Sequence, residues 1–340
     1  MKRTAYLGFS LILIPAFALV GFGQARQPQI RSQAEYGAYM DMFNEQDAQK
    51  KAALGEKFLK EWDESDFIPQ THRAIVGAYS KAQNWAKVME AADRAASSTG
   101  ADNALKAFAY GSAMMAAQNT NNLDKVVSYG EKVLAIAPDD VDTMMVVSAT
   151  IPMKLPSDQA AKNAALDKAS TLATKALGAL QPVIAQAQAA QKPALLQAEG
   201  QLHGTLGLVA FNRPDYKKAV EEYEAAVKAT PKDDLNRYYL GASYSALTSQ
   251  ASKDFQAAVN ALNDAKKARA DQPTIDELDA RQQGLATDFR TFRDRAIEEF
   301  AIAVALSGQV SQQARAELTK LWTAKNDNIS GMEEFIAQKK

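Results

Sequence analysis

The sequence predicts an all-α fold made of many helices, and three observations support this prediction. Apolar residues recur at spacings of three and four through most of the chain after Ala34, which is the period of an amphipathic helix. Strand signals are nearly absent, because the one β-branched patch, at 146–151, is short and runs into Pro152 and Pro156. Ala makes up 65 of the 340 residues, and Ala has the highest helix propensity. We expect helices of roughly 12–18 residues each.

The first 25 residues have the pattern of an export signal. Two basic residues precede an apolar stretch at 6–23, and the small residues Gly23 and Ala25 lie where a signal peptidase requires them. We expect cleavage after Ala25 and a periplasmic or secreted protein with no stable membrane span after cleavage. The apolar stretch also approaches the roughly 20 residues that cross a bilayer, so an inner-membrane anchor formed by residues 6–23 is the alternative.

A linker is expected at 26–34, followed by a first series of helix pairs at 35–182. The clearest second helix in this series begins at Trp85 and places Val88, Ala92 and Ala95 on one face. Helix ends are indicated where Pro is followed by acidic residues, as at Pro138.

The strongest repeat signal lies at 200–265, within a second series of helix pairs expected at 183–300. Two Leu-Gly pairs stand 34 residues apart, and the first is followed by an Ala-x-x-x-Tyr-x-x-Ala pattern and then by Pro. A fixed period of this length is typical of a two-helix repeat. The repeat-defining positions are Leu206, Gly207, Ala219, Tyr223, Ala226, Pro231, Leu240, Gly241 and Tyr244.

This pattern resembles the tetratricopeptide repeat (TPR), a helix–turn–helix unit of 34 residues. The resemblance implies a right-handed α-solenoid of tandem TPR-like helix pairs. It also implies a small residue where the second helix crosses the first, and an aromatic residue between the two helices. His203 and Ala210 stand where the pattern prefers Trp and Tyr. For the next unit we expect about five extra residues at 245–252 and a second helix at 258–265.

The spacing of the Pro residues that would close each unit is irregular. Pro138 and Pro182 are 44 residues apart, and Pro182 and Pro231 are 49 apart, so we expect insertions at 163–167 and at 183–201. The second insertion is rich in Ala and Gln, and it is either a hinge or a lengthened helix. We favour the lengthened helix because both residues are good helix formers.

The C-terminal part of the chain is expected to close the array. A polar, Pro-containing segment at 271–283 predicts a second boundary. Helices at 301–340 would then cap the last repeat, because a terminal repeat needs a polar outer face.

The residue types exclude many kinds of reactive site. The absence of Cys excludes disulfides, thiolate nucleophiles and iron–sulfur clusters. His72 and His203 are too few for a three-histidine metal site, and both are expected to pack inside helices. Paired acidic residues, as at 139–140 and 233–234, are expected to cap helix starts. We therefore expect no catalytic residues, no cofactor and no bound metal, and we expect that the chain is not an enzyme.

The charge distribution argues against a nucleic-acid partner. The 39 Lys and Arg residues nearly balance the 40 Asp and Glu residues, the net charge is −1, and no basic stripe occurs.

A solenoid of this kind presents a groove lined by its first helices. The candidate groove residues are Gln201, Leu208, Phe211, Asn212, Tyr238 and Ser245. The alternative for Phe211 and Tyr238 is that they seal the seam between repeats. The predicted function is a non-enzymatic protein–protein interaction scaffold of the bacterial cell envelope, with another protein or peptide as partner. A periplasmic peptide- or glycan-binding module, or an accessory subunit of an enzyme complex, is the alternative.

Overall fold

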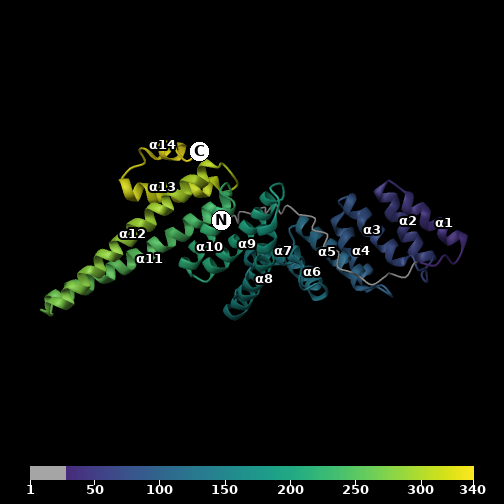
Figure 1. Cartoon of the computed structure of the whole chain (residues 1–340), viewed down its shortest axis with the longest axis horizontal. Coiled ribbons are helices and arrows are strands. Elements are labelled where there is room, and N and C mark those ends of the chain that lie inside the picture. Colours follow the sequence, from purple (N-terminus) through teal and green to yellow (C-terminus); the bar gives the residue numbers. More distant parts are fainter. Residues whose placement is uncertain (1–27) are drawn as a thin grey trace. The chain divides into compact units, whose positions relative to one another are not determined.

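The computed structural model describes residues 28–340, and the export signal expected at 1–25 lies outside this part of the chain. Residues 28–340 form α-helices, one 3-10 turn and connecting loops, without strands. They divide into two compact units, 28–179 and 180–340, each described by itself (Figure 1). No helix in the described part is long and apolar enough to cross a membrane.

The first unit is a series of helices joined by short loops, in which most neighbours along the chain pack against each other. Its first helix begins at Gln33, so the last two residues of the expected linker are helical. The elements are α1 (Gln33–Asn44), α2 (Ala48–Glu61), α3 (Ile68–Lys81), α4 (Trp85–Ser97), α5 (Asn103–Asn119), α6 (Leu123–Ile136), α7 (Val141–Thr150), the 3-10 turn η1 (Ile151–Met153) and most of α8 (Gln159–Gln186).

The second unit contains the end of α8 and six further helices, including two that are unusually long. These are α9 (Lys192–Asn212), α10 (Tyr216–Ala229), α11 (Asp234–Lys267), α12 (Gln272–Ala305), α13 (Ser311–Asn326) and α14 (Met332–Ala337). The prediction of helices of 12–18 residues is wrong for α8, which has 28 residues, for α9, which has 21, and for α11 and α12, which have 34 each. It is also wrong for the shorter helices α7 and α14, which have 10 and 6 residues.

Polar side chains fix many helix starts. The carboxylate of Asp140 accepts the backbone N–H of Thr143 at 2.8 Å, and that of Asp233 accepts the N–H of Asn236 at 2.9 Å. Each bond satisfies one of the free donors at a helix N-terminus. The prediction that these acidic pairs cap helices is confirmed.

Small residues allow the helices of the first unit to approach closely. Ala91, Ala92 and Ala95 of α4 are essentially inaccessible to solvent. At Gly55 of α2, a Cβ atom would lie 2.5 Å from a side-chain carbon of Ile75. A larger residue at such a position would force the helices apart.

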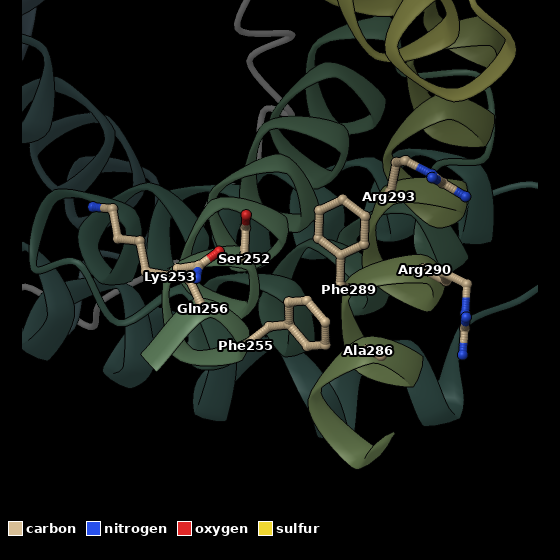
Figure 2. A pocket seen from close by; sticks show the side chains of 8 residues that line it. All are labelled: Ser252, Lys253, Phe255, Gln256, Ala286, Phe289, Arg290 and Arg293. Carbon is tan, nitrogen blue, oxygen red and sulfur yellow. The ribbon is translucent and has the colours of Figure 1, made fainter. Parts of the chain in front are cut away.

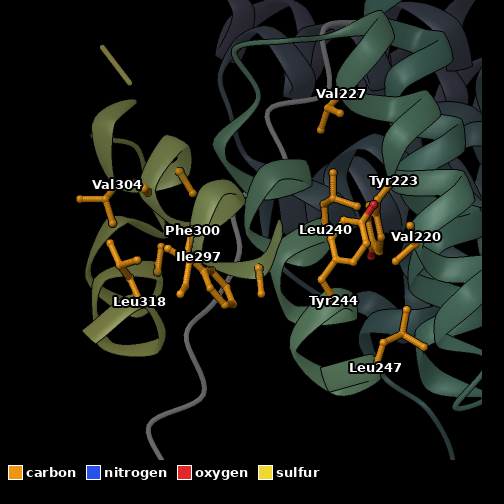
Figure 3. Packing of buried hydrophobic residues seen from close by; sticks show 14 of the residues in the cluster. Val220, Tyr223, Val227, Leu240, Tyr244, Leu247, Ile297, Phe300, Val304 and Leu318 are labelled. Carbon is orange, nitrogen blue, oxygen red and sulfur yellow. The ribbon is translucent and has the colours of Figure 1, made fainter. Parts of the chain in front are cut away.

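In the second unit, an aromatic ring on the second helix of each pair packs against a glycine of the first helix. A Cβ atom on Gly207 of α9 would lie 2.8 Å from the ring of Tyr223 of α10, and one on Gly241 of α11 would lie 2.9 Å from the ring of Phe300 of α12. Both rings are buried in the core of this unit, shown in Figure 3.

The second helix of the repeat that begins with Leu240 is the C-terminal part of α12. Its Ala296-x-x-x-Phe300-x-x-Ala303 has the same spacing as the pattern that surrounds Tyr223, and both alanines are fully buried. The prediction of a second helix at 258–265 is wrong, because these residues continue α11. The five extra residues expected at 245–252 are likewise part of this helix.

A helical hairpin is inserted within this repeat. Gly207 and Tyr223 are 16 residues apart, whereas Gly241 and Phe300 are 59 apart, so 59 − 16 = 43 additional residues separate the second pair. They form the distal halves of α11 and α12, which lie side by side up to their connecting turn (Figure 1). The segment expected as a boundary at 271–283 does not divide compact units. It begins at the turn between α11 and α12, where Asp271 caps α12 and Pro273 lies in its first turn.

The lengthened helix predicted at 183–201 is also wrong. Helix α8 ends at Gln186, and α9 begins at Lys192 with Pro193 in its first turn. Inside a continuous helix Pro193 would remove a backbone hydrogen bond, whereas in the first turn of α9 its missing N–H costs none. The insertion expected at 163–167 lies inside α8.

The last two helices cover the end of α12, as expected for a cap. Leu318 of α13 and Met332 and Ile336 of α14 are buried in the core of the second unit. The expected start of the cap at residue 301 falls inside α12, which continues to Ala305. The described chain is thus an all-α solenoid of tandem helix pairs with C-terminal capping helices.

A buried ion pair joins α11 to α12 near the contact between Phe300 and Gly241. A guanidinium nitrogen of Arg237 lies 2.8 Å from the Glu299 carboxylate, and the Glu299 side chain is 3% exposed. Arg237 also donates to the backbone carbonyl of Pro231 at 3.3 Å. These bonds compensate charges that would otherwise be costly to bury.

We predict opposite effects of Ala at two helical glycines of this unit. At Gly207 an added methyl group meets the buried ring of Tyr223, and overpacking should exceed the gain in helix propensity, a net loss of about 1–2 kcal/mol. At Gly284 of α12, where nothing lies within 4 Å of an added Cβ, the same change should stabilise by up to about 1 kcal/mol. Urea denaturation followed by circular dichroism tests both predictions. Equal shifts of the urea midpoint in the two variants would contradict the close contact between Tyr223 and Gly207.

We also predict that Arg237→Met destabilises the chain by about 3–5 kcal/mol, because Glu299 stays buried without its cation. The double variant Arg237→Met/Glu299→Met should recover most of this loss. As a control, Lys87→Met removes an exposed ion pair with Glu90 and should leave the urea midpoint nearly unchanged. A double variant as unstable as the single one would show that the pairing itself is unimportant.

Candidate interaction surfaces

The six candidate groove residues lie on α9 and α11, the first helices of the two pairs in the second unit. All six are partly buried. The Asn212 amide donates to the backbone carbonyl of Leu208 at 2.9 Å, and the backbone carbonyl of Ser245 accepts the Ser249 hydroxyl at 3.1 Å. Gln201 contributes its backbone carbonyl to the Thr205 hydroxyl.

The aromatic candidates pack against the hydrophobic core. The Phe211 ring lies 5.5 Å from the Tyr216 ring and 6.2 Å from the Tyr239 ring, measured between centroids. The Tyr238 ring lies 5.7 Å from the Phe300 ring. Burial, and then the nearby Glu317 carboxylate of α13, raises the pKa of Tyr238. The structure thus gives both side chains a role in sealing the packing, which was the alternative to a role in binding.

The repeat-defining residues divide by exposure. Leu206 is half-buried and Pro231 is exposed, whereas the other seven are buried: Gly207, Ala219, Tyr223, Ala226, Leu240, Gly241 and Tyr244. Tyr244 also donates its hydroxyl to the Glu224 carboxylate at 2.6 Å, and burial followed by this bond raises its pKa to about 12. These positions hold the helix pairs together.

The two histidines occupy packing positions. His72 is buried in α3, and burial is the first cause that lowers its pKa. The Nδ1 atom of His203 lies 2.8 Å from the Glu222 carboxylate, whose other oxygen lies 3.0 Å from the Lys218 ammonium. Within the described chain, no group of three or more His, Asp or Glu side chains could hold a metal ion.

A groove that the sequence did not predict lies between the two helices of the inserted hairpin. Its volume is about 720 Å³, and its walls come from both long helices (Figure 2). The lining residues are Ser252, Lys253, Phe255, Gln256, Ala286, Phe289, Arg290 and Arg293.

Two half-buried rings form the apolar part of this groove, and cations lie on both sides of them. In Figure 2, Phe255 and Phe289 lie between Lys253 on one side and the two arginines on the other. The Arg293 guanidinium lies 5.5 Å from the centroid of the Phe289 ring and pairs with Asp294, which lies outside the groove, at 3.1 Å. Such a position over a ring holds the cation in place.

The other two cations have no such partner. Among the described residues, no carboxylate lies within ion-pair distance of Lys253 or Arg290, and Arg290 donates to the Thr287 hydroxyl at 3.5 Å. Both side chains belong to exposed residues. The groove therefore carries positive charge that the protein itself does not neutralise.

Repeating apolar residues in the sequence could have indicated this hairpin. On α11 they lie at 251, 255, 258, 262 and 265, and on α12 at 275, 278, 285, 289 and 292. The spacings on α11 alternate between four and three, and those on α12 do so as well once Gln282 is counted at the seam. Such a pattern is typical of a coiled coil. The groove itself has no such linear signal, because its lining comes from segments about 30 residues apart.

Comparisons with known proteins do not identify a family for this chain. No protein-family model and no curated protein matches the chain. Among solved structures, the human IFIT1 dimer with m7Gppp-AAAA is 13% identical, with 92% of this chain and 69% of that chain covered and a TM-score of 0.34. A monomeric IFIT1 mutant with Gppp-AAAA is also 13% identical, with 90% and 68% covered and the same TM-score. Likenesses this low carry no argument about function.

We predict that Glu222 contributes a pH-dependent part of the stability. Burial opposes ionisation, but the bonds from His203 and Lys218 prevail, so the pKa of Glu222 is lowered from 4.5. A lowered pKa means that the contribution is complete above pH 4.5 and is lost as the pH falls through the lowered pKa. The stability difference between wild type and Glu222→Gln should therefore be constant near neutral pH and shrink in acid. Glu221→Gln, at an exposed neighbour, is the control. A difference that persists unchanged in acid would contradict this assignment.

Proposed function

We propose that this protein is a non-enzymatic interaction scaffold, built from TPR-like repeats and exported to the bacterial cell envelope, where it binds another protein. One observation carries the proposal. Two successive helix pairs share the spacing of small and aromatic residues that resembles the TPR, and both seat the aromatic ring against a glycine of the first helix. Repeat arrays of this kind offer extended surfaces, since each repeat contacts only its neighbours.

The surface available for binding in the second unit is the inserted hairpin. Phe211 of α9 and Tyr238 of α11 pack against the core, whereas the hairpin carries an open groove with two rings and two cations that have no carboxylate partner. A repeat that only needed to stack on its neighbours would not require these 43 extra residues, so we assign the hairpin to partner binding.

The sequence supports export and a non-enzymatic role. Residues 1–25 have the order of charge, apolar stretch and small residues that signal peptidases recognise, and a chain without Cys suits an oxidising compartment. Both histidines are engaged in packing or in a side-chain contact within the fold. The nearly balanced charge favours a protein over a nucleic acid as the partner.

The proposal predicts stoichiometric capture of a protein. The full chain with a C-terminal tag should be purified from envelope extracts after mild cross-linking, with an unrelated exported helical protein under the same tag as control. One protein recovered in a fixed ratio, and absent from the control, supports the scaffold. Recovery of RNA would contradict it. Recovery of no partner, together with a rise in melting temperature with a peptide or glycan, would instead support a ligand-binding module.

A further inference from the structure

Alanines lie beside the two rings that line the groove of the hairpin. In a coiled coil, apolar side chains of each helix fill the spaces between those of the other. Beside Phe255 the neighbouring seam positions of α11 are Ala251 and Ala258, and on α12 the residue that lines the groove beside Phe289 is Ala286. These short side chains cannot cover the rings, so both rings remain accessible from the groove.

The charge of the groove differs from that of the hairpin around it. Residues 250–293 contain seven Lys or Arg and seven Asp or Glu, a net charge of zero. The eight lining residues contain three of the cations and no carboxylate. The positive charge is thus concentrated on one face, where it adjoins the apolar rings.

This proposal rests on the proposed function as a protein-binding scaffold. We infer that the groove binds an acidic amphipathic helix of the partner protein. An apolar side chain of that helix would contact Phe255 and Phe289, and carboxylates on both sides of it would pair with Lys253 and Arg290.

The dimensions of the groove favour a helix as the occupant. From Ala286 to Arg293 the lining of α12 extends over eight residues, about 10 Å or two helical turns. A third helix laid along two antiparallel helices presents side chains at i, i+3 and i+4 to the same groove. Carboxylates one turn before and after its apolar residues would then reach cations on opposite sides.

The same features disfavour a nucleic acid in this groove. Single-stranded RNA is bound by rings that stack on bases and by a track of cations that follows the backbone. Here the rings are part of the helix–helix seam, and beyond the three groove cations residues 250–293 contain four basic and seven acidic residues. RNA is therefore an outcome of the test that would overturn the inference.

The experiment uses the full chain and two fluorescein-labelled helical peptides of about 14 residues, four turns. Both peptides carry Leu at the same i, i+3, i+4 and i+7 positions, with Glu at the flanking positions of one and Lys in the other. Fluorescence anisotropy should show the Glu peptide binding at least about tenfold more tightly than the Lys peptide. Added salt should weaken this binding.

Charge reversal locates the binding. Lys253→Glu/Arg290→Glu should weaken the Glu peptide about tenfold and strengthen the Lys peptide. Lys266→Glu/Arg281→Glu makes the same change of charge on the same hairpin outside the groove, and it should leave both affinities nearly unchanged. Circular dichroism confirms that both variants fold.

Three results would overturn the inference: no binding of the Glu peptide to the folded wild type, equal loss in the two charge-reversed variants, or tighter binding of oligouridine than of the Glu peptide. The scaffold is tested separately by capture from envelope extracts. A partner captured equally by wild type and by Lys253→Glu/Arg290→Glu would preserve the scaffold and reject this groove as its site.

Discussion

The contact between a buried aromatic ring and a helical glycine determines how each helix pair of the second unit is built. Tyr223 lies against Gly207, and Phe300 lies against Gly241, at distances that leave no room for a Cβ atom. Because the ring occupies the space that a side chain would fill, the two helices of a pair can cross closely. The flanking alanines at 219 and 226, and at 296 and 303, extend the same close approach along the second helix.

This contact also explains how the repeat tolerates a long insertion. The helices of the second pair leave their crossing point, continue outward as α11 and α12, and return to it. The crossing is preserved because Phe300 packs against Gly241 as Tyr223 packs against Gly207. The Arg237–Glu299 ion pair and the capping helices α13 and α14 also hold α11 and α12 together near this crossing. The coiled-coil seam then supplies the stability of the outer part, so the insertion carries its own packing.

The sequence predicted the all-α fold, the capped helix starts and the packing of Tyr223 between two helices. Each of these features depends on residues that are close in the chain. It misplaced the second helix of the next pair. Ala258, Leu262 and Ala265 have the same spacing of four and three as Ala296, Phe300 and Ala303. A coiled-coil seam and the second helix of a repeat share this period, and only the contact with Gly241 distinguishes them. That contact joins residues 59 apart, which local periodicity cannot detect.

The groove was missed for a related reason. The six candidates lie on the first helices, where a solenoid groove is expected, yet Phe211 and Tyr238 pack against the core. In a repeat with a compact pair of helices, the first helix can present such side chains to a partner. Here the inserted hairpin provides a separate surface, and the half-buried rings of Phe255 and Phe289 line its groove. The residues that hold the helix pairs together and those that line the groove are therefore different sets, so the lining can change without altering the contacts of Tyr223 and Phe300 with their glycines.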